Sequence, residues 1–214
     1  MYSKEIISYL NDIAPESENW VQALEEEAIE HHVPIMDKQG ISILQQLVRL
    51  HQPVKILEIG TAIGYSALRM LEAHPQASIV TVERDQQMYE RAIHNIERQQ
   101  KQQNVDVILG DALEKETEIL AKGPYNIIFI DAAKGQYRRF FESYLPALKS
   151  NGMIITDNVL FRGLVADASE APKRLQNLAN KIDQYNQWLL QHPSFHTTIL
   201  PVGDGIAISI KKNE

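Results

Sequence analysis

Residues 55–66, with the sequence KILEIGTAIGYS, carry the pattern that decides the fold. A short run of apolar residues is followed by two glycines, Gly60 and Gly64, and then by a helical pattern that begins near Tyr65. This order is typical of a strand, a tight turn and a helix, which together form the βα unit of a parallel sheet. Because the strand is almost continuously apolar, we expect it to be covered on both faces.

The same unit repeats along the chain. Apolar runs that predict strands lie at 55–59, 78–83, 105–109, 126–130 and 153–156. Helical patterns lie at 65–74, 86–102, 112–122, 136–149 and 172–191. The C-terminus differs, because the apolar runs at 195–201 and 206–210 flank Gly203-Asp204-Gly205, a sequence typical of a hairpin turn. We therefore expect an α/β protein with a mostly parallel sheet, helices on both faces and a C-terminal antiparallel hairpin.

The first fifty residues follow helical patterns, most clearly at 17–32 and 38–51, and Pro53 ends the second helix. We expect one domain over residues 1–214, with N-terminal helices in residues 1–52 and a Rossmann-like core in residues 53–214.

No apolar run approaches the roughly 18 residues of a membrane span, and the N-terminus lacks the apolar centre of a secretory signal. We expect a cytoplasmic protein without a membrane partner.

The composition excludes several kinds of chemistry. The 214 residues include no cysteine, which rules out disulfides, thiolate metal sites and a cysteine nucleophile. The 28 acidic residues outnumber the 21 basic ones and give a net charge of -7, which disfavours a broad nucleic-acid-binding face. In an open α/β sheet, ligands bind beyond the carboxyl ends of the strands. We therefore expect the functional residues to lie at those strand ends.

The first three strand ends predict an adenosyl ligand without phosphates. The turn after the first strand places Ala62 where a dinucleotide-binding loop has its central glycine, and Glu58 adds a negative charge beside Gly60. Both features disfavour a phosphate and suit a ligand with an ammonium group. The second strand ends in Glu83, suited to the two hydroxyls of a ribose, and the third is followed by Asp111, placed to meet an adenine.

The next two strand ends predict a metal site. Asp131 follows the fourth strand, and Asp157 and Asn158 follow the fifth. Two carboxylates and an amide oxygen form a hard ligand set that favours Mg²⁺ or Ca²⁺, with positions left for water or substrate. Lys134 lies one helical turn after Asp131, so it is a candidate base in the same cleft. Taken alone, the two aspartates are also consistent with helix or turn caps.

The motifs LEIGTAIGYSA, GDA, IDAAK and TDN, together with the acid at Glu83, resemble those of the metal-dependent class I S-adenosylmethionine O-methyltransferases, which include catechol and caffeoyl-CoA enzymes. The resemblance covers nearly the whole chain and implies the class I methyltransferase fold with a seven-stranded sheet. It implies S-adenosylmethionine and Mg²⁺ as cofactors, and a homodimer. It also assigns roles by position: cofactor contacts at Met36, Glu58, Gly60, Ser66, Glu83, Asp111 and Asp131; metal ligands at Asp131, Asp157 and Asn158; catalysis at Lys134 and Asp131.

More narrowly, HHVPIMDKQG, FIDAAKGQY, TDNVLFRGLVA and PVGDGIAIS resemble the bacterial tRNA 5-hydroxyuridine methyltransferases, which form 5-methoxyuridine at the wobble position of anticodons. This resemblance implies a tRNA partner. The charge distribution permits one: residues 1–30 hold eight acids and one lysine, whereas residues 132–181 hold eight basic residues and four acids. The acidity of the chain therefore belongs to its N-terminal helices.

Three alternatives remain open. A catechol-type enzyme acting on small molecules would share the cofactor and the metal. A nicotinamide-dependent oxidoreductase is disfavoured by the missing central glycine. A non-catalytic adenosyl-binding module is disfavoured by the metal set, because a binder has no need of an open magnesium site.

Overall fold

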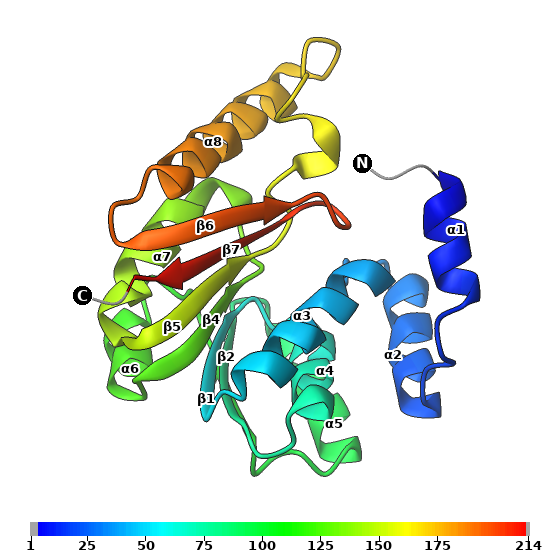
Figure 1. Ribbon diagram of the computed structural model, residues 1–214. Helices are drawn as coiled ribbons and strands as arrows, with labels where there is room; N and C mark the ends of the chain where they lie inside the picture. Colours follow the sequence, from blue (N-terminus) through cyan, green and yellow to red (C-terminus); the bar gives the residue numbers. More distant parts are fainter. Residues whose placement is uncertain (1–3, 213–214) are drawn as a thin grey trace.

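The computed structural model describes residues 4–212. In this range, seven strands form one sheet in the order β3-β2-β1-β4-β5-β7-β6 (Figure 1). The strands are β1 (Lys55–Ile59), β2 (Ser78–Glu83), β3 (Val105–Leu109), β4 (Tyr125–Ile130), β5 (Leu148–Thr156), β6 (Phe195–Leu200) and β7 (Ile206–Lys211). The first five are parallel, whereas β7 runs antiparallel to both β5 and β6. The predicted fold class is therefore confirmed, including its C-terminal hairpin.

Helices cover both faces of the sheet (Figure 1). The described helices are α1 (Lys4–Asp12), α2 (Asn19–Glu30), α3 (Lys38–His51), α4 (Tyr65–Ala73), α5 (Gln86–Arg98), α6 (Glu116–Ala121), α7 (Tyr137–Tyr144) and α8 (Lys173–Leu190). Helices α2 to α5 contribute to one buried apolar cluster, which includes Ile56 and Phe129 of the sheet. Helices α6 to α8 contribute to a second cluster on the opposite face, which includes Leu57 and Ile128. Among residues 4–212, no helix combines the length and apolar character needed to cross a bilayer.

Local chemistry explains where the elements depart from the predicted bounds. Helix α6 begins later than expected because Asp111 closes a turn first: its carboxylate accepts a hydrogen bond from the Leu113 N–H at 2.8 Å. Helix α7 ends at Tyr144 because Pro146 follows within a 3-10 turn, Leu145–Ala147. Strand β5 starts earlier than predicted, at Leu148, because its first residue pairs with Tyr125 of β4.

The turn after β1 depends on a glycine. Gly60 has a φ of 102°, and a Cβ atom there would lie 2.0 Å from the Asp131 backbone oxygen. Only glycine tolerates both the backbone conformation and this approach. The ends of β1 and β4 therefore lie against each other, and the residues that follow them face one space.

Candidate active site

A pocket of about 420 Å³ opens at the carboxyl ends of the parallel strands. It is lined by residues from every strand end that the sequence singles out, and also by the loop before α3. The predicted residues on its surface are Met36, Gly60, Ser66, Glu83, Asp111, Asp131, Lys134, Asp157 and Asn158. The fold therefore brings together nine positions that span more than half of the chain.

On the side predicted to hold the adenosyl group, backbone hydrogen bonds fix the acidic side chains. The Glu83 carboxylate accepts hydrogen bonds from the Ala62 N–H at 2.8 Å and from the Asp85 N–H at 2.9 Å. Because both oxygens are bound, this carboxylate has a defined orientation at the end of β2. Ala62 itself has a φ of 46°, and its bond to Glu83 stabilises that left-handed turn.

Glu58 is the one predicted cofactor residue that does not line the pocket. Its side chain is fully buried beneath the pocket floor, where it accepts hydrogen bonds from Ser66 Oγ at 2.5 Å and Thr81 Oγ1 at 2.6 Å. Burial raises the pKa of Glu58 to about 7, against the opposing effect of those two hydroxyls. Glu58 therefore acts on the pocket through Ser66, whose orientation it fixes.

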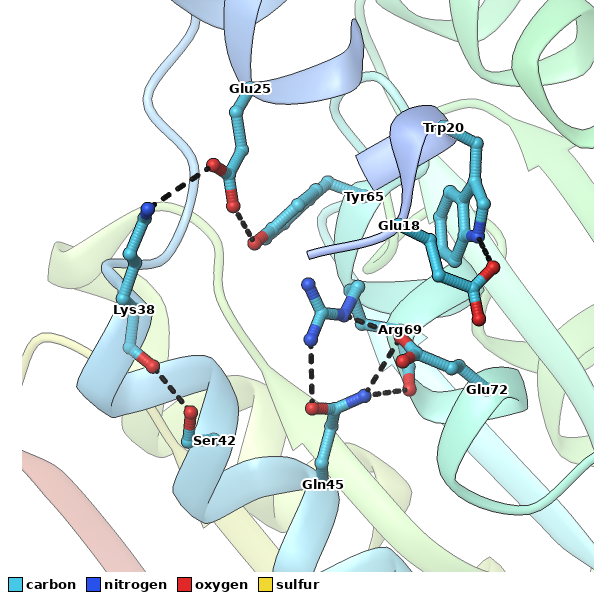
Figure 2. Close-up of polar contacts among 9 residues, drawn as sticks. All are labelled: Glu18, Trp20, Glu25, Lys38, Ser42, Gln45, Tyr65, Arg69 and Glu72. Atoms are coloured by element: carbon cyan, nitrogen blue, oxygen red, sulfur yellow. Dashed lines mark hydrogen bonds and ion pairs between the residues drawn. The ribbon is translucent and has the colours of Figure 1, made fainter. Parts of the chain in front are cut away.

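The loop between α2 and α3 covers the pocket and places Pro34, Ile35 and Met36 on its surface. Side chains on both flanking helices hold this loop (Figure 2). The Tyr65 hydroxyl donates to Glu25 of α2 at 3.0 Å, and Glu25 also lies 3.8 Å from the ammonium group of Lys38 in α3. Because Tyr65 begins α4 and lines the pocket, this contact ties the N-terminal helices to the pocket wall.

The opposite end of the pocket is strongly acidic. Asp131 and Asp157 are both buried deeply enough that desolvation raises their pKa values, and the negative charge of Asp131 raises the pKa of Asp157 further. The Asn158 side chain donates to Asp157 Oδ2 at 2.9 Å, and Asn158 Oδ1 accepts a hydrogen bond from Lys134 Nζ. The Tyr137 hydroxyl donates to the Asp157 backbone oxygen at 2.9 Å, which fixes the end of β5.

This donor set fits a divalent cation. The pKa values of both buried carboxyls are raised although Lys134 lowers them, so Lys134 alone does not offset the burial of two carboxylates and the repulsion that Asp131 exerts on Asp157. Among residues 4–212, no group of three carboxylate, imidazole or thiol side chains forms a metal site. A cation here would therefore have two carboxylates and the Asn158 amide oxygen as ligands, and water or substrate would complete its coordination.

Sequence reasoning missed several residues that shape the site. Tyr65 and Phe140 line the pocket, and Asp204, in the β6–β7 turn, lies close enough to Lys134 for their charges to interact. Tyr65 directly follows the second glycine of the first turn, so its position was a usable signal. Phe140 and Asp204 gave no comparable signal, because each reaches the site through packing between distant segments.

Comparisons with known proteins agree with this geometry. The profile of a family described as O-methyltransferase matches residues 11–212. The catechol O-methyltransferase of Niastella koreensis is 31% identical, over 84% of this chain and 83% of its own. Caffeoyl-CoA O-methyltransferase 1 of Arabidopsis thaliana is 28% identical, over 97% of this chain and 85% of its own.

Solved structures extend the similarity to the whole fold. A Staphylococcus aureus protein described provisionally as a caffeoyl-CoA O-methyltransferase is 36% identical, with a TM-score of 0.88 over 98% of each chain. An O-methyltransferase from Bacillus cereus, solved in complex with SAH (S-adenosylhomocysteine), is 26% identical, with a TM-score of 0.83 over 97% of each chain. A profile that spans nearly all of the sequence, together with relatives at this identity and coverage, establishes that the chain belongs to the O-methyltransferase family of the caffeoyl-CoA and catechol type.

Proposed function

We propose that this protein is an O-methyltransferase that uses S-adenosylmethionine and Mg²⁺. The observation that carries the proposal is the continuity of the pocket, in which Glu83 and Asp111 lie at one end and Asp131, Asp157 and Asn158 at the other. A methyl donor bound along the first three strand ends would point its reactive group toward the acidic end. The SAH in the structure of the Bacillus cereus relative supports this choice of cofactor.

The cofactor contacts follow from the chemistry of each wall. The Glu83 carboxylate accepts hydrogen bonds from the ribose hydroxyls, and Asp111 lies beside the adenine. Met36 and Ser66 contact the methionine portion, and Gly60 allows the ligand to approach the backbone. These roles are proposals for residues that the structure places on the pocket surface.

The reaction is a direct transfer in which the acceptor oxygen forms a bond to the methyl carbon as the sulfur–methyl bond breaks. Asp131, Asp157 and Asn158 would hold Mg²⁺, which would lower the pKa of an acceptor hydroxyl and fix its direction. Lys134 Nζ lies beside these residues, where it can assist the deprotonation of the acceptor hydroxyl. Tyr137 and Asn158 hold Asp157 in place through their hydrogen bonds to its backbone and side chain.

For the acceptor, we propose 5-hydroxyuridine at the wobble position of a tRNA anticodon, converted to 5-methoxyuridine. Its 5-hydroxyl and the neighbouring C4 carbonyl oxygen can chelate one metal ion, as the two oxygens of a catechol do. The surface near the pocket supports an anionic partner. Arg139 hydrogen-bonds Gln136 of the pocket lining at 3.1 Å, and three further basic residues, Arg162, Lys173 and Arg174, are exposed between the end of β5 and the start of α8.

A small catechol is the second candidate acceptor. The relatives favour it, because they include catechol and caffeoyl-CoA O-methyltransferases. The same carboxylates, amide and lysine would serve either acceptor, since both present a hydroxyl next to a second oxygen. The substrates therefore differ in what they require outside the pocket: a tRNA needs contacts to its phosphates, and a catechol does not.

An assay that compares the two substrates tests the proposal. Labelled S-adenosylmethionine is supplied with tRNA that carries 5-hydroxyuridine, or with a catechol, and product nucleosides are identified by mass spectrometry. We expect methoxyuridine, and we expect the double variant K173A/R174A to lose tRNA methylation while any transfer to catechol is unchanged. Transfer to the catechol alone would overturn the tRNA assignment. Methylation that survives both D157A and EDTA would overturn the metal assignment.

We also propose that two copies associate through α1, in line with the homodimer that the family resemblance implies. Tyr9, Leu10 and Ile13 are 61%, 39% and 58% exposed, and Figure 1 shows α1 at the edge of the molecule. Covering such apolar side chains would stabilise a dimer. Sedimentation of the wild type and of the Y9E/I13E variant tests this: a wild type that is monomeric at micromolar concentration would refute it.

A further inference from the structure

The tip of the β6–β7 hairpin, residues 201–205, packs against the segment that carries the metal-binding asparagine. The Val159 N–H donates to the Gly205 oxygen at 3.0 Å, and the Leu160 N–H donates to the Asp204 oxygen at 2.8 Å. A Cβ atom on Gly205 would lie 2.3 Å from Leu160 Cγ, so the two segments are in tight contact. The hairpin tip is therefore part of the frame around the acidic end of the pocket.

The segment that it contacts has an unusual backbone. Between residues 158 and 163, four residues occupy the left-handed region: Asn158 at φ 58°, Phe161 at 47°, Arg162 at 57° and Gly163 at 81°. Side chains disfavour this region, and such a conformation persists only where the surroundings fix it. Because Asn158 begins this turn, whatever stabilises the turn also fixes the direction of the Asn158 side chain.

Asp204 supplies a side-chain contact to this strained backbone. Its carboxylate Oδ1 accepts a hydrogen bond from the Arg162 N–H, and its own backbone oxygen holds Leu160. Burial raises the pKa of the Asp204 carboxyl, and its bond to the Arg162 N–H and the nearby positive charges of Lys134 and Arg162 oppose this shift. Asp204 therefore binds the turn at two points and also faces the lysine of the active site.

The same hairpin tip also touches the loop that covers the pocket. A Cβ atom on Gly203 would lie 2.0 Å from the Asp37 carboxylate. That carboxylate caps α3 by accepting hydrogen bonds from the Gln39 and Gly40 N–H groups at 3.0 and 2.9 Å, and the residue directly follows Met36 of the pocket lining. One short turn thus contacts both the segment that carries Asn158 and the residue that follows Met36.

We propose that Asp204 is a positioning residue, which holds the left-handed turn at residues 158–163 so that the Asn158 side chain faces Asp157. The effect on metal and acceptor rests on the proposed function, whereas the effect on the turn does not. The role needs a hydrogen-bond acceptor at this place more than a charge. An asparagine, which keeps the side-chain oxygen, should therefore replace Asp204 far better than alanine does.

The test compares D204A and D204N with the control D167A, which removes an exposed aspartate that caps the Ser169 N–H in the same connection. Hydrogen–deuterium exchange of the peptide that covers residues 158–163 is measured without ligands. We expect D204A to exchange faster there, and D204N and D167A to match the wild type. Unchanged exchange in D204A, or equal acceleration in D204A and D204N, would overturn the proposal.

The affinities of D204A for Mn²⁺ and SAH then test whether the turn affects the active site. We expect D204A to weaken Mn²⁺ binding about tenfold or more, as the loss of a residue that orients a metal ligand does. SAH affinity should change less than about twofold, since one hydrogen bond at the far end of the pocket is lost. Normal Mn²⁺ affinity in D204A would refute the positioning of Asn158. A wild type that binds no Mn²⁺ would instead refute the proposed metal site, while the exchange result still decides the role of Asp204 in the turn.

Discussion

Replacing Glu58 with glutamine should change the stability of the protein in a pH-dependent way. The free energy of unfolding of E58Q, measured relative to that of the wild type, should be higher at high pH than at low pH. Glu58 is fully buried, and its two hydrogen bonds come from the hydroxyls of Ser66 and Thr81. The pKa of Glu58 is raised from 4.5 to about 7, mainly by burial; the two hydroxyls oppose this shift, and the negative charges of Asp131 and Glu83 contribute to it. Ionised Glu58 is therefore unfavourable in the folded state.

The sign and size of the effect follow from proton linkage. The folded protein keeps the Glu58 proton between pH 4.5 and about 7, where the unfolded chain releases it, so stability falls as the pH rises through this window. At about 1.4 kcal/mol per pKa unit, this shift costs about 1 kcal/mol at pH 5 and about 3 kcal/mol at pH 8. Glutamine has a similar shape and carries no charge, and the neighbouring hydroxyls can rotate to accept its N–H bonds.

Urea unfolding of the ligand-free wild type and E58Q at both pH values measures the difference. Groups that titrate equally in both proteins cancel, so the stability of E58Q relative to the wild type should rise by about 2 kcal/mol from pH 5 to pH 8. E114Q, at an exposed glutamate, should show no such change. A difference between E58Q and the wild type that is independent of pH would refute the raised pKa, whatever its absolute size.

Four other variants test the site and its frame. D131A or D157A should reduce methyl transfer by at least about a thousandfold in a labelled-cofactor assay, as expected when metal stabilisation is lost, and transfer that resists EDTA would contradict this. G60A should destabilise the protein by about 3 kcal/mol or more in thermal unfolding, because its Cβ would meet the Asp131 oxygen; near-normal stability would contradict that contact. Y65F should lower the free energy of unfolding by about 1 kcal/mol through loss of its bond to Glu25, and an unchanged urea midpoint would contradict this.

Sequence patterns predicted the sheet because the information is local there. Strands β1, β2 and β3 have the bounds that their apolar runs indicate, and each ends where a glycine or an acid interrupts the run. Since parallel strands end at one edge, the residues after Ile59, Leu109 and Ile130 had to meet. The composition of the pocket therefore followed from the order of strand ends, without any knowledge of packing.

Depth within the fold was not predictable in the same way. Glu58 and Glu83 both lie on strands beside the same turn, and the sequence assigned both to the ligand. The structure buries Glu58 below the pocket and leaves Glu83 on its surface. Glu58 lies inside β1, covered on both faces, whereas Glu83 ends β2, where the chain leaves the sheet. A nearly continuous apolar strand does not reveal which face its single polar residue occupies.

Contacts between distant turns were the least predictable part of the site. Asp37, Arg162 and Gly203 lie in three separate connections, and no local pattern around them indicates that these connections meet. Their meeting depends on β7 lying antiparallel beside β5, because this pairing returns the hairpin tip to the end of β5. The antiparallel hairpin thus has a second consequence beyond closing the sheet: it brings Asp204 to the turn that begins with Asn158. A parallel final strand would end at the same edge but could not present a tight turn there. The strand order of this fold is therefore itself a determinant of how Asn158 is held.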